Sequence, residues 1–180
     1  MGAVLKLKGS TKEDIDYLGS EIQSYQNKTA DRIKQMLISL RGVHGGFALD
    51  QLEHCLQTAT RAEAGGADRE MIVMSLCHDV GKAISWENHG EITAEILRPF
   101  LSERSIWIVQ FHQDFQGRHF LHHIGGNRDK YLIHKDSPFF NQALQFSEWD
   151  LAAFDPNFKS KPLTHFEPLL KEFFKASIKN

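Results

Sequence analysis

The chain is poor in cysteine and lacks any long hydrophobic run. Its 2 cysteines, Cys55 and Cys77, form no CxxC pair and fall inside stretches with helical apolar spacing. We therefore expect small buried residues in a reducing compartment, not a disulfide framework. No apolar run approaches the about 20 residues that span a bilayer, and Met1 to Lys8 is too short and too lysine-rich for a signal-peptide core. These absences predict a cytoplasmic protein with no membrane partner.

An excess of basic charge is also missing. The 21 Lys and Arg residues face 23 Asp and Glu residues, for a formal net charge of -2. Without a basic field we expect no nucleic-acid partner. A chain of 180 residues with 41% hydrophobic content is typical of one globular domain, which we take to cover residues 1–180. No heptad repeat decides the oligomeric state.

Apolar residues recur at helical spacing nearly throughout, and no convincing strand pattern is present. Thr11 to Asp14 has the form of a capping box, Pro138 suits the first turn of a helix, and Pro168 is expected within the first turn of the last one. The segment 68–79 is apolar on most sides, so we expect it to be central. The predicted helices cover residues 11–27, 31–40, 50–64, 68–79, 88–101, 103–114, 137–154 and a last segment from 164. The prediction is an all-α, globular helical domain.

Two segments interrupt this pattern. Residues 41–47 are glycine-rich and are predicted to form a loop. Residues 115–136 are rich in histidine and aromatic residues and are broken by glycines, with a short helix expected near Lys130. Long loops in compact domains are usually functional or mobile. The segment 115–136 is therefore a candidate lid.

Histidine is abundant, with 10 in the chain, and six histidines and aspartates follow the order H…HD…H…H…D. Neutral imidazoles and carboxylates suit iron, manganese and similar metal ions. In the adjacent pair, one residue can bind one metal ion while the neighbouring carboxylate bridges to a second. The six are enough to hold two metal ions: His54, His78, Asp79, His89, His112 and Asp150. The other histidines fit ordinary surface or hydrogen-bonded positions.

Most of these six residues interrupt or end apolar helix faces. A carboxylate on such a face is costly unless it is paired or bound to metal. His78 and Asp79 end the most apolar helix. The apolar stripes are Phe139, Ala143, Phe146 and Ala153 around Asp150; Ile92, Ile96 and Phe100 after His89; and Ser105, Ile108 and Val109 before His112.

His54 is different because it lies off the main apolar stripe of its helix, which comprises Leu52, Leu56 and Ala59. Its helical neighbours are polar: Asp50, Thr58 and Arg61. That polar face is either solvated or lines a pocket.

The order of ligands, with the segments Leu52–Thr60 (LEHCLQTAT) and Leu76–Lys82 (LCHDVGK), resembles the HD-domain superfamily of helical metalloenzymes. The agreement in helix and ligand order runs from about Phe47 to Phe174, which would form the metal-site core. The resemblance implies an HD-domain helical bundle. It is strongest to a bacterial branch described as predicted HD phosphohydrolases.

The resemblance also implies roles. His54, His78, Asp79 and Asp150 would hold a first metal ion, Asp79 would bridge, and His89 with His112 would complete the second site. Lys82 matches a lysine that contacts a phosphate or substrate oxygen in relatives with HDxGK. Asp79 and Lys82 are thus the candidate catalytic residues. Alternatively, Lys82 only complements the dipole at a helix C-terminus.

Two reactions fit the superfamily. HD phosphohydrolases use manganese, cobalt or similar ions on phosphomonoesters or nucleotides. Mixed-valent di-iron oxygenases, which include myo-inositol oxygenase and enzymes that cleave hydroxyphosphonates, oxidise hydroxylated substrates with dioxygen. The chain is similar to the phosphonate oxygenases in its small size, the short interval from His78 to His89 and the helix-initial His89. We therefore favour a di-iron oxygenase acting on a small phosphonate- or polyol-like substrate, with a phosphohydrolase as the alternative. A non-enzymatic binding module is disfavoured because no ligand position is missing.

The chain also departs from the phosphonate oxygenases. They carry a Tyr and a Glu before the first ligand, where this chain has His44–Asp50 with neither, and a Lys where it has Gln116. These differences argue against an aminophosphonate. The candidate contacts for an anionic or hydroxylated small molecule, besides Lys82, are Gln116, Arg118, His119, His122 and His123. The last four could equally form a hydrogen-bonded structural loop.

Overall fold

The computed structural model describes residues 7–175, and within that range all regular structure is helical, so the predicted all-α fold is confirmed. None of the helices in this range is long and apolar enough to cross a bilayer. The prediction that Met1 to Lys8 does not form a signal-peptide core concerns residues that lie mostly outside the described range. The helices are α1 (Lys12–Gln26), α2 (Thr29–Ser39), α3 (Gln51–Ala64), α4 (Arg69–Cys77), α5 (His89–Leu97), α6 (Glu103–Gly117), α7 (Phe140–Ala152) and α8 (Leu163–Phe173). Short 3-10 helices are η1 (Val80–Ala83), η2 (Leu121–Ile124) and η3 (Lys130–His134).

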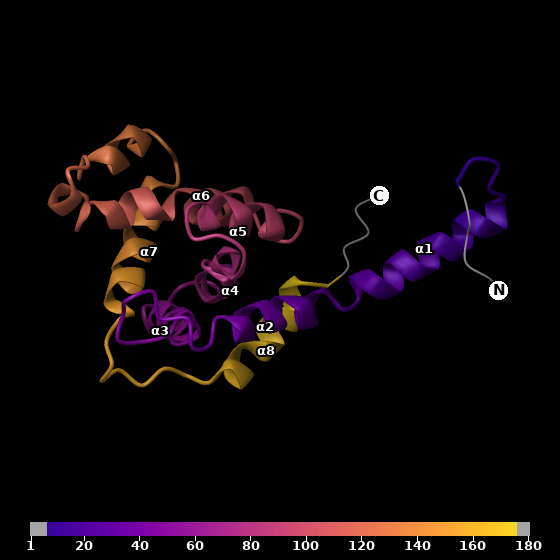
Figure 1. Ribbon diagram of the computed structural model, residues 1–180, viewed down its shortest axis with the longest axis horizontal. Coiled ribbons are helices and arrows are strands. Elements are labelled where there is room, and N and C mark those ends of the chain that lie inside the picture. The colour runs from indigo at the N-terminus through magenta and orange to yellow at the C-terminus, as the bar shows by residue number, and fades with distance from the viewer. Residues whose placement is uncertain (1–6, 176–180) are drawn as a thin grey trace.

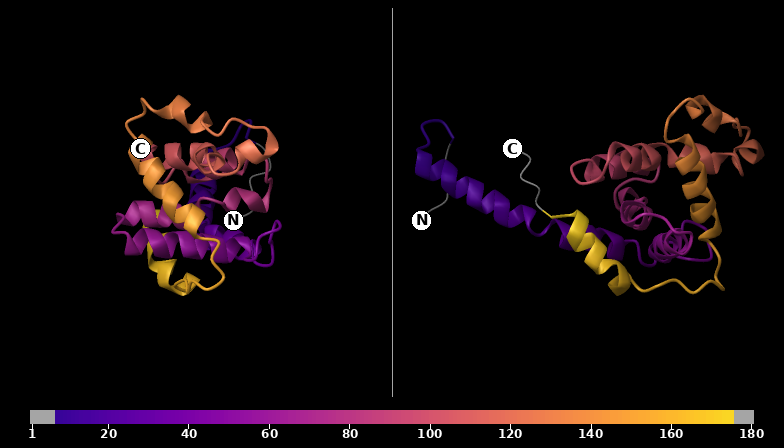
Figure 2. Two further views of the ribbon diagram at one scale, coloured as in Figure 1. Left: turned by 90° about the vertical axis from the view of Figure 1, so that its left-hand side faces the viewer. Right: turned by 180° about the vertical axis from the view of Figure 1, so that it is seen from behind.

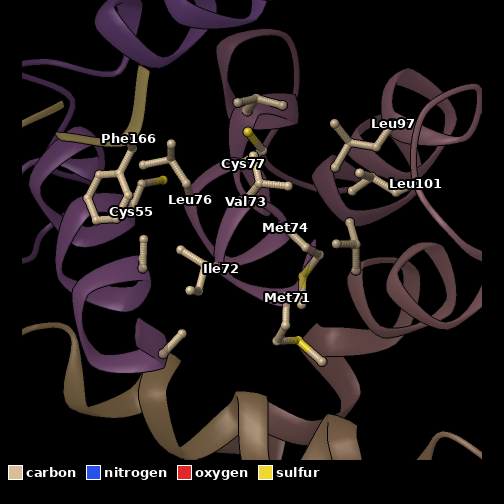
Figure 3. Packing of buried hydrophobic residues seen from close by; sticks show 14 of the residues in the cluster. Cys55, Met71, Ile72, Val73, Met74, Leu76, Cys77, Leu97, Leu101 and Phe166 are labelled. Carbon is tan, nitrogen blue, oxygen red and sulfur yellow. The ribbon is translucent and has the colours of Figure 1, made fainter. Parts of the chain in front are cut away.

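Helix α4 is the central element, as its composition predicts. Every residue from Met71 to Cys77 is buried, and the Asp68 carboxylate caps the helix by accepting a hydrogen bond from the Met71 N–H. Its neighbours are α3, α6 and α8. Figure 3 shows its side chains between Cys55 and Phe166 on one side and Leu97 and Leu101 on the other. Burying each large apolar side chain stabilises the fold by about 1.5–3 kcal/mol.

The remaining core helices close around the C-terminal end of α4. Helix α5 lies along α6, α6 packs on α7, and α7 packs on α3 (Figure 1). Helix α8 returns to α2 and α4. The ring of α3, α5, α6 and α7 therefore surrounds the place where the chain leaves α4.

Helix α1 lies apart from this body. Its predicted capping box is present: the Thr11 hydroxyl accepts from the Asp14 N–H, and the Asp14 carboxylate accepts from the Thr11 N–H. None of its residues is buried, and it extends away from the other helices in both Figure 1 and Figure 2. Arg32 of α2 donates to the Tyr25 carbonyl and lies over the Tyr25 ring, but since none of the residues of α1 is buried among the described residues, its capping box and its own hydrogen bonds define it.

Several predicted helix ends are corrected. Helix α6 continues past Asp114 to Gly117, because Phe115 is fully buried and extends the apolar face. Helix α7 begins at Phe140 and not at residue 137, because the Ser137 hydroxyl accepts the Phe139 N–H in a local turn. Pro168 lies past the first turn of α8, where it is exposed, so water can reach the carbonyl it leaves unbonded.

The predicted inner face of α5 is also corrected. Its buried residues are His89, Gly90, Thr93, Ala94 and Leu97, whereas the predicted stripe of Ile92, Ile96 and Phe100 is only half-buried. A Cβ on Gly90 would lie 3.2 Å from backbone oxygens of α6. Small residues thus let α5 and α6 approach closely. As a result, the buried face of α5 is shifted by one residue from the predicted one.

Candidate metal centre

The four predicted ligand histidines share one hydrogen-bonding arrangement. In each ring, Nδ1 faces a backbone carbonyl, so Nδ1 carries the proton and Nε2 is free to bind a cation. The distances from Nδ1 to the carbonyl oxygens are 3.2 Å for His54 to Ala153, 2.8 Å for His78 to Ser75, 2.7 Å for His89 to Trp86, and 2.6 Å for His112 to Val109. All four rings are therefore held with their basic nitrogen toward the middle of the helical ring.

The first group of donor atoms comprises His54, His78 and Asp150. The two Nε2 atoms lie 3.2 Å apart, and Asp150 Oδ1 lies 3.0 Å from His54 Nε2 and 3.3 Å from His78 Nε2. All three side chains are fully buried. Gln116 donates its amide N–H to the other oxygen, Asp150 Oδ2, and so orients the carboxylate.

The second group comprises His89 and His112, whose Nε2 atoms lie 3.1 Å apart. Asp79 joins the two groups, because each of its oxygens faces one histidine pair. Oδ1 lies 3.1 Å from His89 Nε2 and 3.6 Å from His112 Nε2. Oδ2 lies 3.3 Å from His78 Nε2 and 3.4 Å from His54 Nε2.

The donor atoms fit metal ions in spacing and in chemistry. Ligand atoms bound at about 2.0–2.2 Å with angles near 90–110° lie about 2.8–3.6 Å apart. The distances between the Nε2 and carboxylate oxygen atoms of the two groups, 3.0–3.6 Å, fall within this range. Two Nε2 lone pairs in contact repel each other unless a cation or a proton lies between them. As long as the four Nε2 atoms carry no proton, Asp79 Oδ1 and Asp150 Oδ1 are also buried without a hydrogen-bond donor. Such groups are costly unless a cation satisfies them, so these His and Asp groups could hold metal ions.

The electrostatics follow from this crowding. Burial lowers the pKa of His54 and His78, but the carboxylates of Asp79 and Asp150 outweigh it and raise both, that of His78 to about 10. Burial raises the pKa of both carboxyls, yet the adjacent cationic groups bring each well below its usual range. For His112 burial dominates and lowers the pKa. Without a metal ion, protons on His54 and His78 therefore balance the carboxylates.

The turn after α4 brings the two groups together. Gly81 packs so closely on the start of α5 that a Cβ there would lie 2.3 Å from the His89 backbone oxygen. Its N–H donates to the Thr93 hydroxyl at 2.9 Å. This contact requires glycine and fixes His89 relative to Asp79, two residues before Gly81.

Lys82 lies between this centre and the surface. Its Nζ donates to Asp79 Oδ2 at 2.5 Å and to Gln51 Oε1 at 2.8 Å, and its side chain is 9% exposed. Trp86 lies over the ammonium, with Nζ 5.0 Å from the ring centroid. The lysine thus does more than complement a helix dipole, because its ammonium pairs with the Asp79 carboxylate.

A pocket of about 390 Å³ opens onto the second group of donors. Its lining comprises Phe47, Lys82, Trp86, His89, Gln113, Gln116, His119, Phe120, Leu151 and Phe154. Three of the predicted substrate-binding residues, Lys82, Gln116 and His119, therefore face this space.

The other three predicted contacts do not line the pocket. Arg118 pairs with Glu148 and donates to His119 Nε2 at 2.7 Å. His122 and His123 are exposed on η2, with ring centroids 3.9 Å apart. For Arg118 the structural role is the one seen, because its guanidinium is occupied by these partners.

The candidate lid is tied down at its far end. Lys130 and His134 of η3 contact the Asp114 carboxylate at 2.6 Å and 2.8 Å. His119 and Phe120, near its start, line the pocket. Residues 118–136 thus cover α6 and edge the pocket, and their role as a lid stays a prediction.

The sequence does not decide whether His54 is solvated or buried, and it does not predict the aromatic residues that lie beside it. The residue is fully buried, because α7 covers the polar face of α3 and the Thr58 hydroxyl bonds within the helix to the His54 carbonyl. Phe154 stacks on the His54 ring at 4.0 Å, and Phe47 stacks on Phe154 at 4.2 Å. The one feature of the sequence that could have indicated a role for Phe47 is weak: it is an aromatic residue in a glycine-rich loop.

Comparison with known proteins agrees with this site. Residues 52–137 match the family model described as HD domain. The match supports the HD-domain superfamily, and with the buried His/Asp groups it indicates a metal-dependent enzyme. Asp150, on α7, lies beyond the matched segment. None of the curated proteins compared matches the chain.

Proposed function

We propose that His54, His78, Asp79, His89, His112 and Asp150 hold two metal ions, and that the protein is a di-iron oxygenase acting on a small hydroxylated substrate. The observation that carries this proposal is the Asp79 carboxylate, which presents one oxygen to each histidine pair at 3.1–3.6 Å. A shared carboxylate keeps two ions close enough to act together. His and carboxylate ligands also suit iron.

The chain contributes positioning and charge. When bound, iron ions would supply Lewis-acid and redox chemistry toward dioxygen. The four carbonyl-bound Nδ1–H groups orient the imidazoles, and Gln116 orients Asp150. Lys82 would hold a substrate oxygen at the pocket floor and release Asp79 to the metal ions. The aromatic pocket walls would exclude water from the reacting group.

The pocket favours the oxygenase over phosphoester hydrolysis. A phosphate dianion is usually bound by several cationic or N–H donors. Among the lining residues the one Lys or Arg is Lys82, and it is paired with Asp79. A phosphohydrolase remains the second candidate, since Lys82 lies where a phosphoryl oxygen would approach the His89 side of the centre.

Metal analysis of protein purified from iron-supplemented cells tests the proposal, with EPR after partial oxidation. Two irons per chain, a mixed-valent di-iron signal and substrate-dependent oxygen uptake are expected. Manganese or cobalt in place of iron, with anaerobic phosphate release from phosphomonoesters, would refute the oxygenase and support the second candidate. Protein that binds no metal would refute both.

A further inference from the structure

The walls of the pocket differ in chemistry from its floor. Five of the ten lining residues are hydrophobic, and four of these are aromatic: Phe47, Trp86, Phe120 and Phe154. Three of them are strongly exposed, Phe47 at 45%, Trp86 at 37% and Phe120 at 47%. Exposed aromatic groups gathered at one opening usually mark a binding site. Isolated exposed aromatics would need no such explanation.

These aromatic side chains are held in place from behind. The rings of His54, Phe154 and Phe47 form a continuous stack, with centroid distances of 4.0 Å and 4.2 Å and interplanar angles of 14° and 22°. Trp86 packs against Gly45, where a Cβ would lie 2.2 Å from the indole and where φ is +56°. The walls are thus built surfaces that lead from the metal centre to the outside.

The basic side chains that line the pocket already have partners within the protein. Lys82 donates to Asp79 and Gln51, and its charge also faces the Trp86 ring. His119 Nε2 accepts a hydrogen bond from Arg118, a role that only an unprotonated ring nitrogen can fill. Among the lining side chains no free cation is left for a dianion, so the metal ions alone would have to hold an anionic group. The few remaining polar groups, such as Gln113, are also too sparse to satisfy every hydroxyl of a polyol.

We propose that this pocket binds a substrate with a flat, apolar ring, and that the ring carries a hydroxylated carbon which lies at the His89 end. This inference rests on the proposed function for the reacting hydroxyl, but the ring preference rests on the pocket walls alone. It replaces phosphonates and polyols with hydroxylated aromatic compounds as the substrate class. The ring stacks among Phe47, Trp86 and Phe154, and Lys82 meets the hydroxyl.

Calorimetric titration with three probes tests the inference: 1-phenylethane-1,2-diol, myo-inositol and 2-hydroxyethylphosphonate. The titration uses the full chain, both metal-loaded and after dialysis against a chelator. The aromatic diol should bind at least about tenfold more tightly than the others in both forms. Phe47→Ala should weaken that binding about tenfold, whereas Phe47→Tyr, which keeps the ring, should not. Tyr25→Ala removes an exposed aromatic ring on α1 and serves as the off-site control.

Equal or tighter binding of the polyol or the phosphonate would overturn the inference, as would an absence of binding by all three probes. An aromatic preference that survives Phe47→Ala would also overturn it. Metal content is measured on the same samples. Loss of the aromatic preference in protein that holds two ions contradicts the ring inference alone, and absence of metal with the preference intact contradicts the proposed function alone.

Discussion

Replacing Asp79 with asparagine removes one negative charge from the middle of the centre while keeping the shape of the side chain. Each carboxylate oxygen faces a different histidine pair, at 3.1 and 3.6 Å for Oδ1 and at 3.3 and 3.4 Å for Oδ2. Both proposed ions would lose a charged ligand together. Outer partners of metal ligands change affinity by about 10–100-fold, so loss of this shared ligand should exceed about 100-fold for each ion.

The same substitution should destabilise the metal-free protein. Asp79 is buried and pairs with Lys82 Nζ at 2.5 Å. Removing one partner of a buried ion pair costs about 3–5 kcal/mol. We expect the lower end, because Lys82 opens onto the pocket and water can reach it. At about 2–4 °C per kcal/mol for a chain of this size, Tm should fall by about 6–12 °C.

Metal content per chain and thermal unfolding are the assays. His54→Gln should lose the ion of the first group and keep the other, and His89→Gln should do the reverse. Asp136→Asn, at an exposed position, controls for loss of an acid. Asp79→Asn protein that still binds two ions per chain would refute the bridging role.

Lys82→Ala should mainly raise the apparent KM for substrate, whereas unchanged steady-state kinetics would favour a purely structural role. Metal uptake should strengthen with pH, because the pKa values of His54 and His78 are both raised, that of His78 to about 10, and binding must displace the protons that these two rings hold. The affinity should rise by about tenfold per pH unit for each displaced proton in a chelator-competition titration from about pH 6 to about pH 8, and a flat profile would contradict this. Gly81→Ala should lower the stability by about 1–3 kcal/mol, since its Cβ would meet backbone at 2.3 Å. Gly19→Ala, where nothing lies within 4 Å, should not destabilise the fold, and equal melting temperatures for the two variants would refute the packing argument.

The helices and the inward direction of most candidate ligands follow from apolar periodicity. Asp150 was predictable because it interrupts the stripe that contains Ala143 and Phe146, and all three are buried. The burial of His54 did not follow from periodicity, because Ala153, whose carbonyl contacts its ring, lies 99 positions away in sequence. The face of α5 was misjudged by one residue because Gly90 admits close packing on α6, a contact that hydrophobicity does not encode. The pocket walls likewise come from segments far apart in the chain.

The burial of the two donor groups implies an order in which metal ions would enter and leave the centre. His89 lines the pocket, whereas His54 and His78 are sealed behind it and are 0% exposed. An ion that reaches the inner group by this route must pass the outer one, so the inner ion would enter first and leave last. The outer ion would then exchange with the surroundings while the inner one stays, and a short treatment with chelator would produce a half-filled protein.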